Sequence, residues 1–209
     1  MDAPIRHAKS GPGSGDRNLR IYEKQLKQGV QLDARQTYYY GRELLDNGRY
    51  DQAEKVLEEF LTRKDAWTEN QIDACRQLAV CRYRQKKDEE ALEALLQGLT
   101  FDEPRAETCC DIGRHFFDRG RYPAAVFWYR AALLAQKRPQ GGGFVDEDCY
   151  GFLPCISLCL CCDRMGDMVR ARRYNEMAGK FRPQSPYYLH NREYFREYME
   201  REEVYEVRI

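Results

Sequence analysis

Residues 106–139, AETCCDIGRHFFDRGRYPAAVFWYRAALLAQKRP, decide the fold because they read as two short amphipathic helices joined by a tight turn. In the first half, Ile112, Phe116 and Phe117 recur at helical spacing, and Gly113 leaves room for a neighbouring helix. Gly120 lies in the turn DRGR, where a residue with positive φ is suited. The second half continues the helical spacing with Ala124, Ala125, Trp128, Ala131 and Ala132. Such a helix pair cannot bury both of its faces alone, so we expect the chain to repeat it.

Three other segments carry the same spacing of small residues. The opening stretch sets the pattern with Gly113, Gly120, Ala125 and Ala132. The other segments match it at Gly41, Gly48, Ala53 and Phe60, at Ala79, Lys86, Ala91 and Gly98, and at Cys159, Gly166, Ala171 and Ala178. Four matches in one register predict helix hairpins near residues 34–67, 72–105, 106–139 and 152–185.

This pattern resembles the tetratricopeptide repeat (TPR), a unit of about 34 residues built as a helix–turn–helix. Tyr50 and Tyr122 fill its aromatic position, and Pro183 stands at its terminating position. The second copy departs from the pattern, because Lys86 replaces the turn glycine and Arg82 stands where an aromatic residue is usual. The resemblance implies an all-α fold, a right-handed α-solenoid of about four TPR hairpins.

A single helix is expected to cover the N-terminal end of the solenoid. Residues 1–15 are rich in Pro, Gly and Ser and read as a flexible linker or a domain edge. The solenoid is expected over residues 16–203, starting with a helix over residues 17–28. Asp16 and Gly29 are its predicted caps. Its predicted buried stripe is Leu19, Tyr22 and Leu26.

The C-terminal half contains an insertion and a cap. Residues 136–148 break the repeat period, and the triple glycine at 141–143 argues against a helix there. Loops of this length in compact arrays are often functional or mobile. A final helix over residues 186–201 is polar on much of its surface, as expected of a solenoid cap.

Composition excludes several classes of partner. The 209 residues are 33% charged with a formal net charge of zero, so bulk charge favours neither nucleic acid nor an acidic membrane as the main partner. No stretch approaches the roughly 18 apolar residues of a membrane span, and no secretory signal is evident. A soluble, cytoplasmic protein without a cofactor is expected.

Nine cysteines suggest either a metal site or a core role. Cys155, Cys159 and Cys162 lie at i, i+4 and i+7 on one predicted helical face, with Cys149 and Cys161 nearby. Thiolates at that spacing bind soft metals, but the tight C-x2-C turn of structural zinc sites is missing. The repeat register places these residues against a partner helix, and cysteine behaves there as a small buried hydrophobe. The sequence therefore favours core packing over a metal site or a disulfide framework.

No catalytic residue is predicted. Asp146, Glu147 and Asp148 match the short D-x-D pattern of metal–nucleotide sites, but they follow a glycine loop instead of a predicted strand. They are expected to form a solvated turn and a helix N-cap. The three histidines, His7, His115 and His190, are isolated in the sequence and lack a partnered nucleophile.

The best candidate site is a surface formed by the first helix of each hairpin. In a TPR stack, fixed positions of these helices line a concave groove, and here arginine and aromatic side chains dominate them. These candidate groove residues are Arg35, Tyr38, Arg42, Arg76, Tyr83, Arg84, Glu107, Arg114, Phe117, Ile156, Leu160 and Arg164. The mixture suits carboxylates, phosphates, sugar faces or an extended peptide, and a solvated helical face is the alternative. The expected partner is therefore a protein or peptide, or a glycan acceptor.

Several phrases resemble the C-terminal TPR region of bacterial family 2 glycosyltransferases. They are IRHAKSG and RNLRIYEKQLKQG, the first hairpin, LTFDEPRAETCCDIGRHFF and GFVDEDCYGFLPCISLCLCCDRMGD. In that family a catalytic domain precedes the repeats and ends in a strand carrying a histidine, which Ile5, Arg6 and His7 resemble. The family's nucleotide-binding strand, metal-binding motif and catalytic base have no counterpart here. The resemblance implies that residues 1–15 include the end of a missing catalytic domain and that the parent function is sugar transfer from a nucleotide-sugar, and it does not make this chain itself an enzyme.

Three functions remain open at this point. The leading hypothesis is a non-catalytic TPR module that binds a partner protein or an acceptor for a glycosyltransferase. In the enzymatic alternative the chain itself turns over a nucleotide-sugar through Asp146, Asp148 and His7. In the third, the repeats serve only as a homodimerisation surface.

Overall fold

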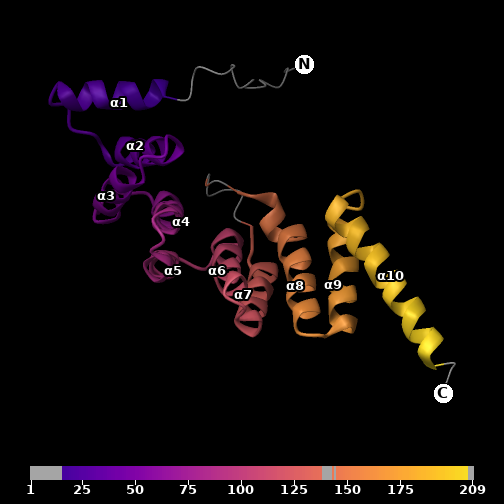
Figure 1. The fold of residues 1–209 in the computed structure, drawn as a ribbon. Helices are drawn as coiled ribbons and strands as arrows, with labels where there is room; N and C mark the ends of the chain where they lie inside the picture. Colours follow the sequence, from indigo (N-terminus) through magenta and orange to yellow (C-terminus); the bar gives the residue numbers. More distant parts are fainter. Residues whose placement is uncertain (1–15, 138–142, 144, 207–209) are drawn as a thin grey trace, which may run out of the picture. The chain divides into compact units, whose positions relative to one another are not determined.

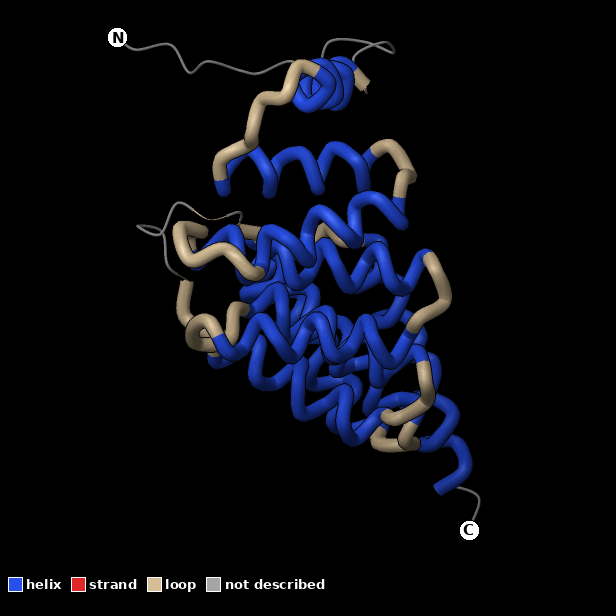
Figure 2. The backbone as a smooth tube through the Cα atoms, turned by 90° about the vertical axis from the view of Figure 1, so that its left-hand side faces the viewer, coloured by secondary structure: helices blue, strands red, loops and turns tan. Residues whose placement is uncertain are grey.

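The computed structural model describes residues 16–137, 143 and 145–206, and all regular structure within them is helical. Figure 1 shows the ten α-helices of these described residues, and Figure 2 shows that loops connect them without any strand. The all-α prediction is confirmed. The chain divides into two compact units, Met1–Ala94 and Leu95–Ile209, which are described separately.

The first unit is built from one single helix and antiparallel helix hairpins. α1 packs on α2, α2 and α3 form a hairpin, and α4 packs against both α2 and α3. The bounds are α1 Arg17–Lys27, α2 Ala34–Asp46, α3 Tyr50–Leu61, α4 Thr68–Arg84 and α5 Asp88–Gln97, the last of which runs into the second unit. Each predicted helix of this unit is present, with its ends moved by one or two residues.

The start of α2 is fixed by a capping box. The Asp33 carboxylate accepts the Gln36 N–H at 2.7 Å, and the Asp33 N–H donates to the Gln36 side chain at 3.1 Å. These two bonds satisfy backbone donors that have no partner in the first helical turn. They place the helix start at Ala34, where the predicted first hairpin at 34–67 begins.

α1 follows its prediction only in part. Leu19 is buried and Tyr22 is half-buried, but Leu26 is 41% exposed, so the predicted buried stripe is wrong at Leu26. Because α1 packs extensively against α2 and against no other described helix, it buries a narrower face than a helix between two others. The Asp16 carboxylate makes no capping hydrogen bond and forms an ion pair with Arg20 instead.

The second hairpin keeps its turn without glycine. Lys86 adopts φ +63° at the place where Gly120 of the third hairpin adopts φ +69°. A left-handed conformation strains a side chain with a Cβ atom, and glycine is free of that strain. Lys86 in place of glycine therefore lowers the stability of the turn but leaves its backbone geometry unchanged.

A polar cluster around Glu54 explains the other departure, at Arg82. The Glu54 carboxylate accepts hydrogen bonds from Arg82 at 3.0 Å, Gln85 at 2.8 Å and Lys87 at 2.9 Å. Arg82 also pairs with Glu58 at 2.8 Å and donates to the Glu90 carbonyl at 2.9 Å. A charged side chain in the usual aromatic position thus ties α3, α4 and the start of α5 together by charge-assisted bonds.

The second unit contains two complete hairpins and a longer final helix. α6 pairs with α7, α8 pairs with α9, and α10 packs against α9. The bounds are η1 Gly98–Thr100, α6 Ala106–Asp118, α7 Tyr122–Leu134, η3 Glu147–Tyr150, α8 Phe152–Arg164, α9 Met168–Phe181 and α10 Pro186–Glu206. α10 extends beyond the predicted cap at 186–201.

The core of this unit is closely packed and rich in cysteine. A Cβ atom added at Gly113 would lie 2.9 Å from the Tyr129 ring, so the predicted close approach of α6 and α7 is confirmed. All nine cysteines are buried, in α4, α6, η3 and α8, and none forms a disulfide. Their predicted role as small core residues is confirmed, because they fill tight contacts between neighbouring helices.

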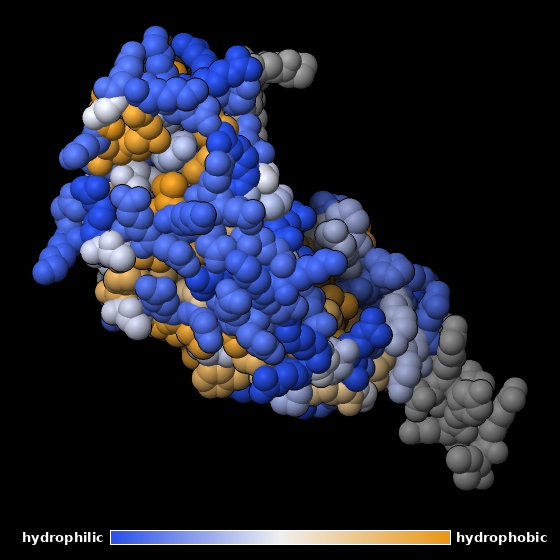
Figure 3. Space-filling model, turned by 60° about the vertical axis from the view of Figure 1, so that its left-hand side comes forward, coloured by the Kyte–Doolittle hydropathy of each residue, from blue (hydrophilic) through white to orange (hydrophobic). Residues whose placement is uncertain are grey.

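The surface is dominated by polar side chains. On the face shown in Figure 3, hydrophilic residues cover most of the area and hydrophobic ones gather in separate patches. Among the described residues, no helix combines the length and the apolar character that crossing a bilayer requires.

Candidate functional site

The first helices α2 and α4 are joined by a buried hydrogen bond. The hydroxyl of Tyr38 donates to the Asp73 carboxylate at 2.5 Å, and Gln77 donates to the same carboxylate at 3.1 Å. Tyr38 is fully buried and Asp73 is 9% exposed. A buried carboxylate requires such donors, because an unpaired charge in the interior is costly.

Tyr38 is held in its neutral, donating form. Burial raises the pKa of its phenol, and the neighbouring Asp73 carboxylate raises that pKa further through its charge and the hydrogen bond. Ionisation would place a second negative charge beside Asp73. The phenol of Tyr38 therefore remains the hydrogen-bond donor in this contact.

Two arginines lie directly over this pair. The guanidinium carbon of Arg42 is 5.8 Å from the centre of the Tyr38 ring, within cation–π range. A guanidinium nitrogen of Arg76 is 3.5 Å from the Asp73 carboxylate, and the Arg76 side chain remains 23% exposed. The Tyr38–Asp73 pair thus orients Arg42 and Arg76. We define the α2–α4 surface as the exposed parts of Arg35, Arg42, Arg76 and Arg84.

The predicted groove residues of the first unit have different roles. Arg35 and Arg84 are exposed, and the Arg35 guanidinium lies 5.7 Å from the Tyr39 ring centre. Arg42, Arg76 and Tyr83 are half-buried. Tyr38, which the sequence assigned to the groove lining, is fully buried and supports the surface from beneath.

The predicted groove residues of the second unit are less uniform in charge. Arg114 is exposed and lies 3.7 Å from Asp118, and Phe117 packs against the Tyr122 ring at 5.5 Å between centroids. On α8, Leu160 and Arg164 are exposed, whereas Ile156 is only 8% exposed and belongs to the core. These side chains combine positive, negative and apolar groups, whereas arginines predominate among the predicted groove residues of α2 and α4.

Glu107 anchors the end of the insertion. Its carboxylate accepts the Asp146 N–H at 2.9 Å and the Tyr150 hydroxyl at 3.0 Å. Burial raises the pKa of Tyr150, and the Glu107 carboxylate raises it further, so the phenol remains a donor. Glu107 is 3% exposed, so it holds the segment before α8 and offers no surface to a ligand.

The D-x-D carboxylates serve the local fold. Asp146 accepts the Asp148 N–H at 3.1 Å and caps η3, as the predicted turn and N-cap required, although the helix it caps is a short 3₁₀ turn. Asp148 pairs with Arg182 at 2.5 Å. His7, the third residue of the enzymatic alternative, lies outside the described residues. In the part of the chain that the structure describes, no three His, Cys, Asp or Glu side chains form a metal-binding group.

Sequence reasoning missed the acidic members of these surfaces. Asp73, Asp118 and Asp163 occupy the same repeat positions as the predicted groove residues, and Asp163 accepts the Tyr194 hydroxyl at 3.3 Å. The register alone placed them there. The sequence analysis favoured arginine and aromatic residues at these positions, and Glu107 was the one acidic residue that it included.

Comparisons with known proteins agree with this geometry. Residues 41–106 match the tetratricopeptide repeat family model. This stretch covers the end of the first hairpin's opening helix, all of α3, α4 and α5, and the first residue of α6. It includes Lys86 and Arg82, so the second hairpin is similar to the TPR family model despite its departures from the pattern.

Solved TPR structures share the fold. A MamA crystal structure is 18% identical with a TM-score of 0.60, covering 80% of this chain and 82% of its own. YrrB, described as a TPR protein with an unusual peptide-binding site, is 17% identical with a TM-score of 0.60, covering 86% and 84%. PilF of Pseudomonas aeruginosa is 18% identical with a TM-score of 0.57, covering 87% and 82%. No curated protein matches in sequence. Similarity at this level shows the fold alone.

Proposed function

We propose that the chain is a protein-interaction module whose α2–α4 surface binds an extended, acidic segment of a partner protein. The observation that carries the proposal is the placement of Arg42 and Arg76 over the buried Tyr38–Asp73 pair. Support comes from the TPR match over this region and from the general use of helical repeats as binding surfaces.

Arginine chemistry decides the class of ligand. A guanidinium offers a planar fork of donors that matches a carboxylate, and it stacks on aromatic faces. Four arginines lie at groove positions of α2 and α4, against the acidic residues Asp46 and Asp73 at other groove positions. Four guanidinium groups against two carboxylates leave these positions with a net positive charge, although Asp73 keeps its own charge while it accepts from Tyr38 and Gln77. An acidic peptide with aromatic residues matches both properties.

A direct titration tests the proposal. The probe is a fluorescein-labelled peptide of glutamate, tyrosine and proline, in which proline keeps the backbone extended. Arg42→Glu and Arg76→Glu should each weaken binding by about tenfold, because each replaces attraction with repulsion. Arg17→Glu, at an exposed arginine of α1, should change the affinity by less than about twofold. Equal losses in all three variants, or no saturable binding, would exclude the α2–α4 surface.

A finer proposal concerns the partner. The resemblance to family 2 glycosyltransferases supports a partner or acceptor that acts in sugar transfer, and it rests on the sequence phrases alone. The coding sequence upstream of Ile5 tests it, since a reading frame for a strand–helix catalytic domain would support this parentage. Calorimetry with a nucleotide-sugar and Mn²⁺ tests the enzymatic alternative, and we expect no heat of binding. Light scattering over a concentration series tests the homodimer alternative.

A further inference from the structure

We infer that the face formed by α9 and α10 is a second docking surface, and that it binds an acidic amphipathic helix of another protein. This surface lies entirely in the second unit, far in sequence from α2 and α4, and the inference does not depend on the α2–α4 surface. It rests on a hollow of about 1200 Å³ between α9 and α10. That volume exceeds the roughly 300–1,000 Å³ of small-molecule pockets, which favours a peptide segment as the occupant.

The order of packing in the repeats indicates a helical occupant. In both units the second helix of a hairpin packs against its own first helix and against the first helix that follows. α3 lies against α2 and α4, α7 against α6 and α8, and α9 against α8 and α10. α10 therefore holds the position of a first helix, and its bond from Tyr194 to Asp163 of α8 agrees with that position. Among the described residues no second helix packs on α10, and the hollow borders α10 on the side that faces α9.

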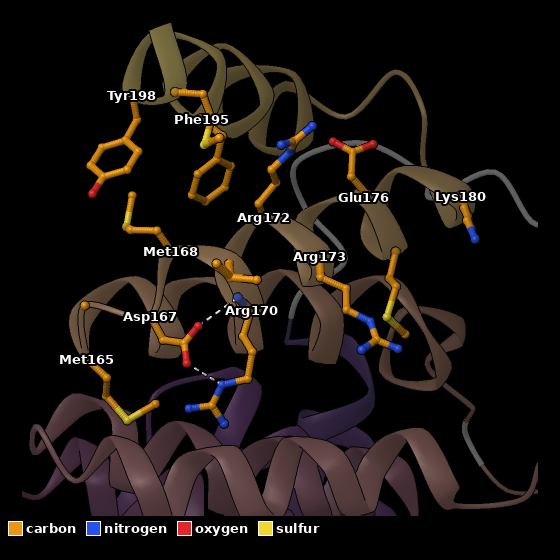
Figure 4. A pocket seen from close by; sticks show the side chains of 14 residues that line it. Met165, Asp167, Met168, Arg170, Arg172, Arg173, Glu176, Lys180, Phe195 and Tyr198 are labelled. Carbon is orange, nitrogen blue, oxygen red and sulfur yellow. Dashed lines mark hydrogen bonds and ion pairs between the residues drawn. The ribbon is translucent and has the colours of Figure 1, made fainter. Parts of the chain in front are cut away.

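The hollow has an apolar floor suited to a helix face. Phe195 and Tyr198 of α10 face α9, and Met168 of α9 points towards them (Figure 4). Val169 is 83% exposed on the same face, and Met165 and Met199 are also exposed. Methionine adapts its shape to different partners and is common on surfaces that bind amphipathic helices.

The rim of the hollow is basic. Arg172, Arg173 and Lys180 line it, and none makes an ion pair within the described residues, whereas Asp167 is occupied by Arg170 at 2.6 Å. Glu176 is the other acidic side chain in the lining. A helix with an apolar stripe flanked by carboxylates would therefore pack its stripe on the apolar floor and pair its carboxylates with the basic side chains of the rim.

Charge also decides against a second copy of this chain as the occupant. The helix that a second copy would offer is α1, whose most extensive packing among the described helices is with α2. α1 contains Arg17, Arg20, Lys24 and Lys27 and only one acidic residue, Glu23. Docking of the basic helix α1 against the basic rim is electrostatically unfavourable. Head-to-tail association of two copies is therefore the alternative that the experiment must distinguish from binding of another protein's helix.

The test uses designed helical probes and the full chain. One labelled peptide carries leucines at i, i+3, i+4 and i+7 with glutamates at the flanking positions, and its partner carries lysines there instead. The acidic peptide should bind more tightly. Arg172→Glu with Arg173→Glu should weaken its binding at least about tenfold, and Val169→Asp by about tenfold. Arg130→Glu, at an exposed arginine of α7, should change it by less than about twofold.

Three results would overturn the inference. The first is tighter binding of the lysine peptide, and the second is equal weakening by Arg130→Glu. The third is self-association: the molecular mass of the wild type rises with concentration in light scattering, and the Val169→Asp variant stays at the monomer mass. This result would identify a second copy of the chain as the occupant. Arg42→Glu with Arg76→Glu should leave binding of the acidic helix unchanged, which separates this surface from the α2–α4 surface.

Discussion

The hydroxyl of Tyr38 donates a 2.5 Å hydrogen bond to Asp73, and this contact ties the first helices of two successive hairpins together. The residues are 35 positions apart, one in each of two successive hairpins. Because Arg42 lies over the ring and Arg76 beside the carboxylate, the same contact orients the arginines of the α2–α4 surface. A structural bond and the proposed recognition surface therefore depend on the same two side chains.

Removing the Tyr38 hydroxyl should destabilise the protein. Tyr38→Phe leaves the ring in place and deprives Asp73 of its shortest hydrogen bond, so we expect a loss of about 1–2 kcal/mol in the free energy of unfolding. Tyr39→Phe, in the next position of the same helix, should cost less than about 0.5 kcal/mol. Thermal and urea unfolding of the two variants measure the difference. Similar losses would show that the hydroxyl contributes nothing specific.

The Glu54 cluster should make stability depend on pH. Burial alone would raise the pKa of Glu54, but hydrogen bonds from Lys87, Gln85 and Arg82 outweigh it and hold the pKa below its ordinary value of 4.5. A carboxylate with a lowered pKa stabilises the fold above its unfolded-state pKa, and this contribution is lost as the pH falls through the folded-state pKa.

Glu54→Gln measures this contribution. At neutral pH it should cost about 1–3 kcal/mol, because Arg82 and Lys87 lose their charged acceptor. The gap between wild type and variant should narrow below the ordinary pKa of 4.5. Urea unfolding at several pH values is the measurement, with the exposed Glu59→Gln of the same helix as the control. A gap that stays constant down to acidic pH would contradict the role of the Glu54 charge.

Lys86→Gly should stabilise the second hairpin. Lys86 is exposed and adopts φ +63°, so the substitution removes backbone strain and few contacts. We expect a gain of about 0.5–1 kcal/mol, since the strain relieved exceeds the extra entropy of glycine in the unfolded chain. The reverse change, Gly120→Lys at φ +69°, should destabilise by a similar amount. If the thermal midpoints of both variants shift in the same direction from the wild-type value, this explanation of the turn is refuted.

The cysteines should be unreactive while the protein is folded. Burial raises the pKa of Cys81, Cys109 and Cys155 to about 11, from an ordinary value of 9.0, so few thiolates form near pH 8. Mass spectrometry after iodoacetamide treatment should show almost no labelling of the native protein, and labelling of all nine cysteines in denaturant. Rapid labelling of cysteines in α8 under native conditions would contradict their core position.

The sequence predicted the hairpins because the spacing of Gly113, Gly120, Ala125 and Ala132 reports directly on close helix contacts. The same register predicted buried cysteines correctly. It failed at Leu26, since exposure depends on how many neighbours a terminal helix has, and periodicity contains no such information.

The sequence did not predict the contacts between side chains that lie far apart along the chain. Arg82 was visible as a departure from the pattern, but its pairing with Glu54, 28 positions away, depends on how α3 meets α4. Tyr38 was predicted in the groove and proved to be its support, because the register gives the face of a helix and not the depth of a side chain. The hollow beside α9 required the position of α10, which no local pattern specifies.

The charge preference of the α2–α4 surface is the most direct measurement. Two extended probes of the same length are titrated against the full chain, one with glutamates and one with lysines. Wild type should prefer the acidic peptide, and Arg42→Glu with Arg76→Glu should reverse the order, because the surface then carries the opposite charge. A preference that stays the same in the double variant would contradict recognition by these two arginines.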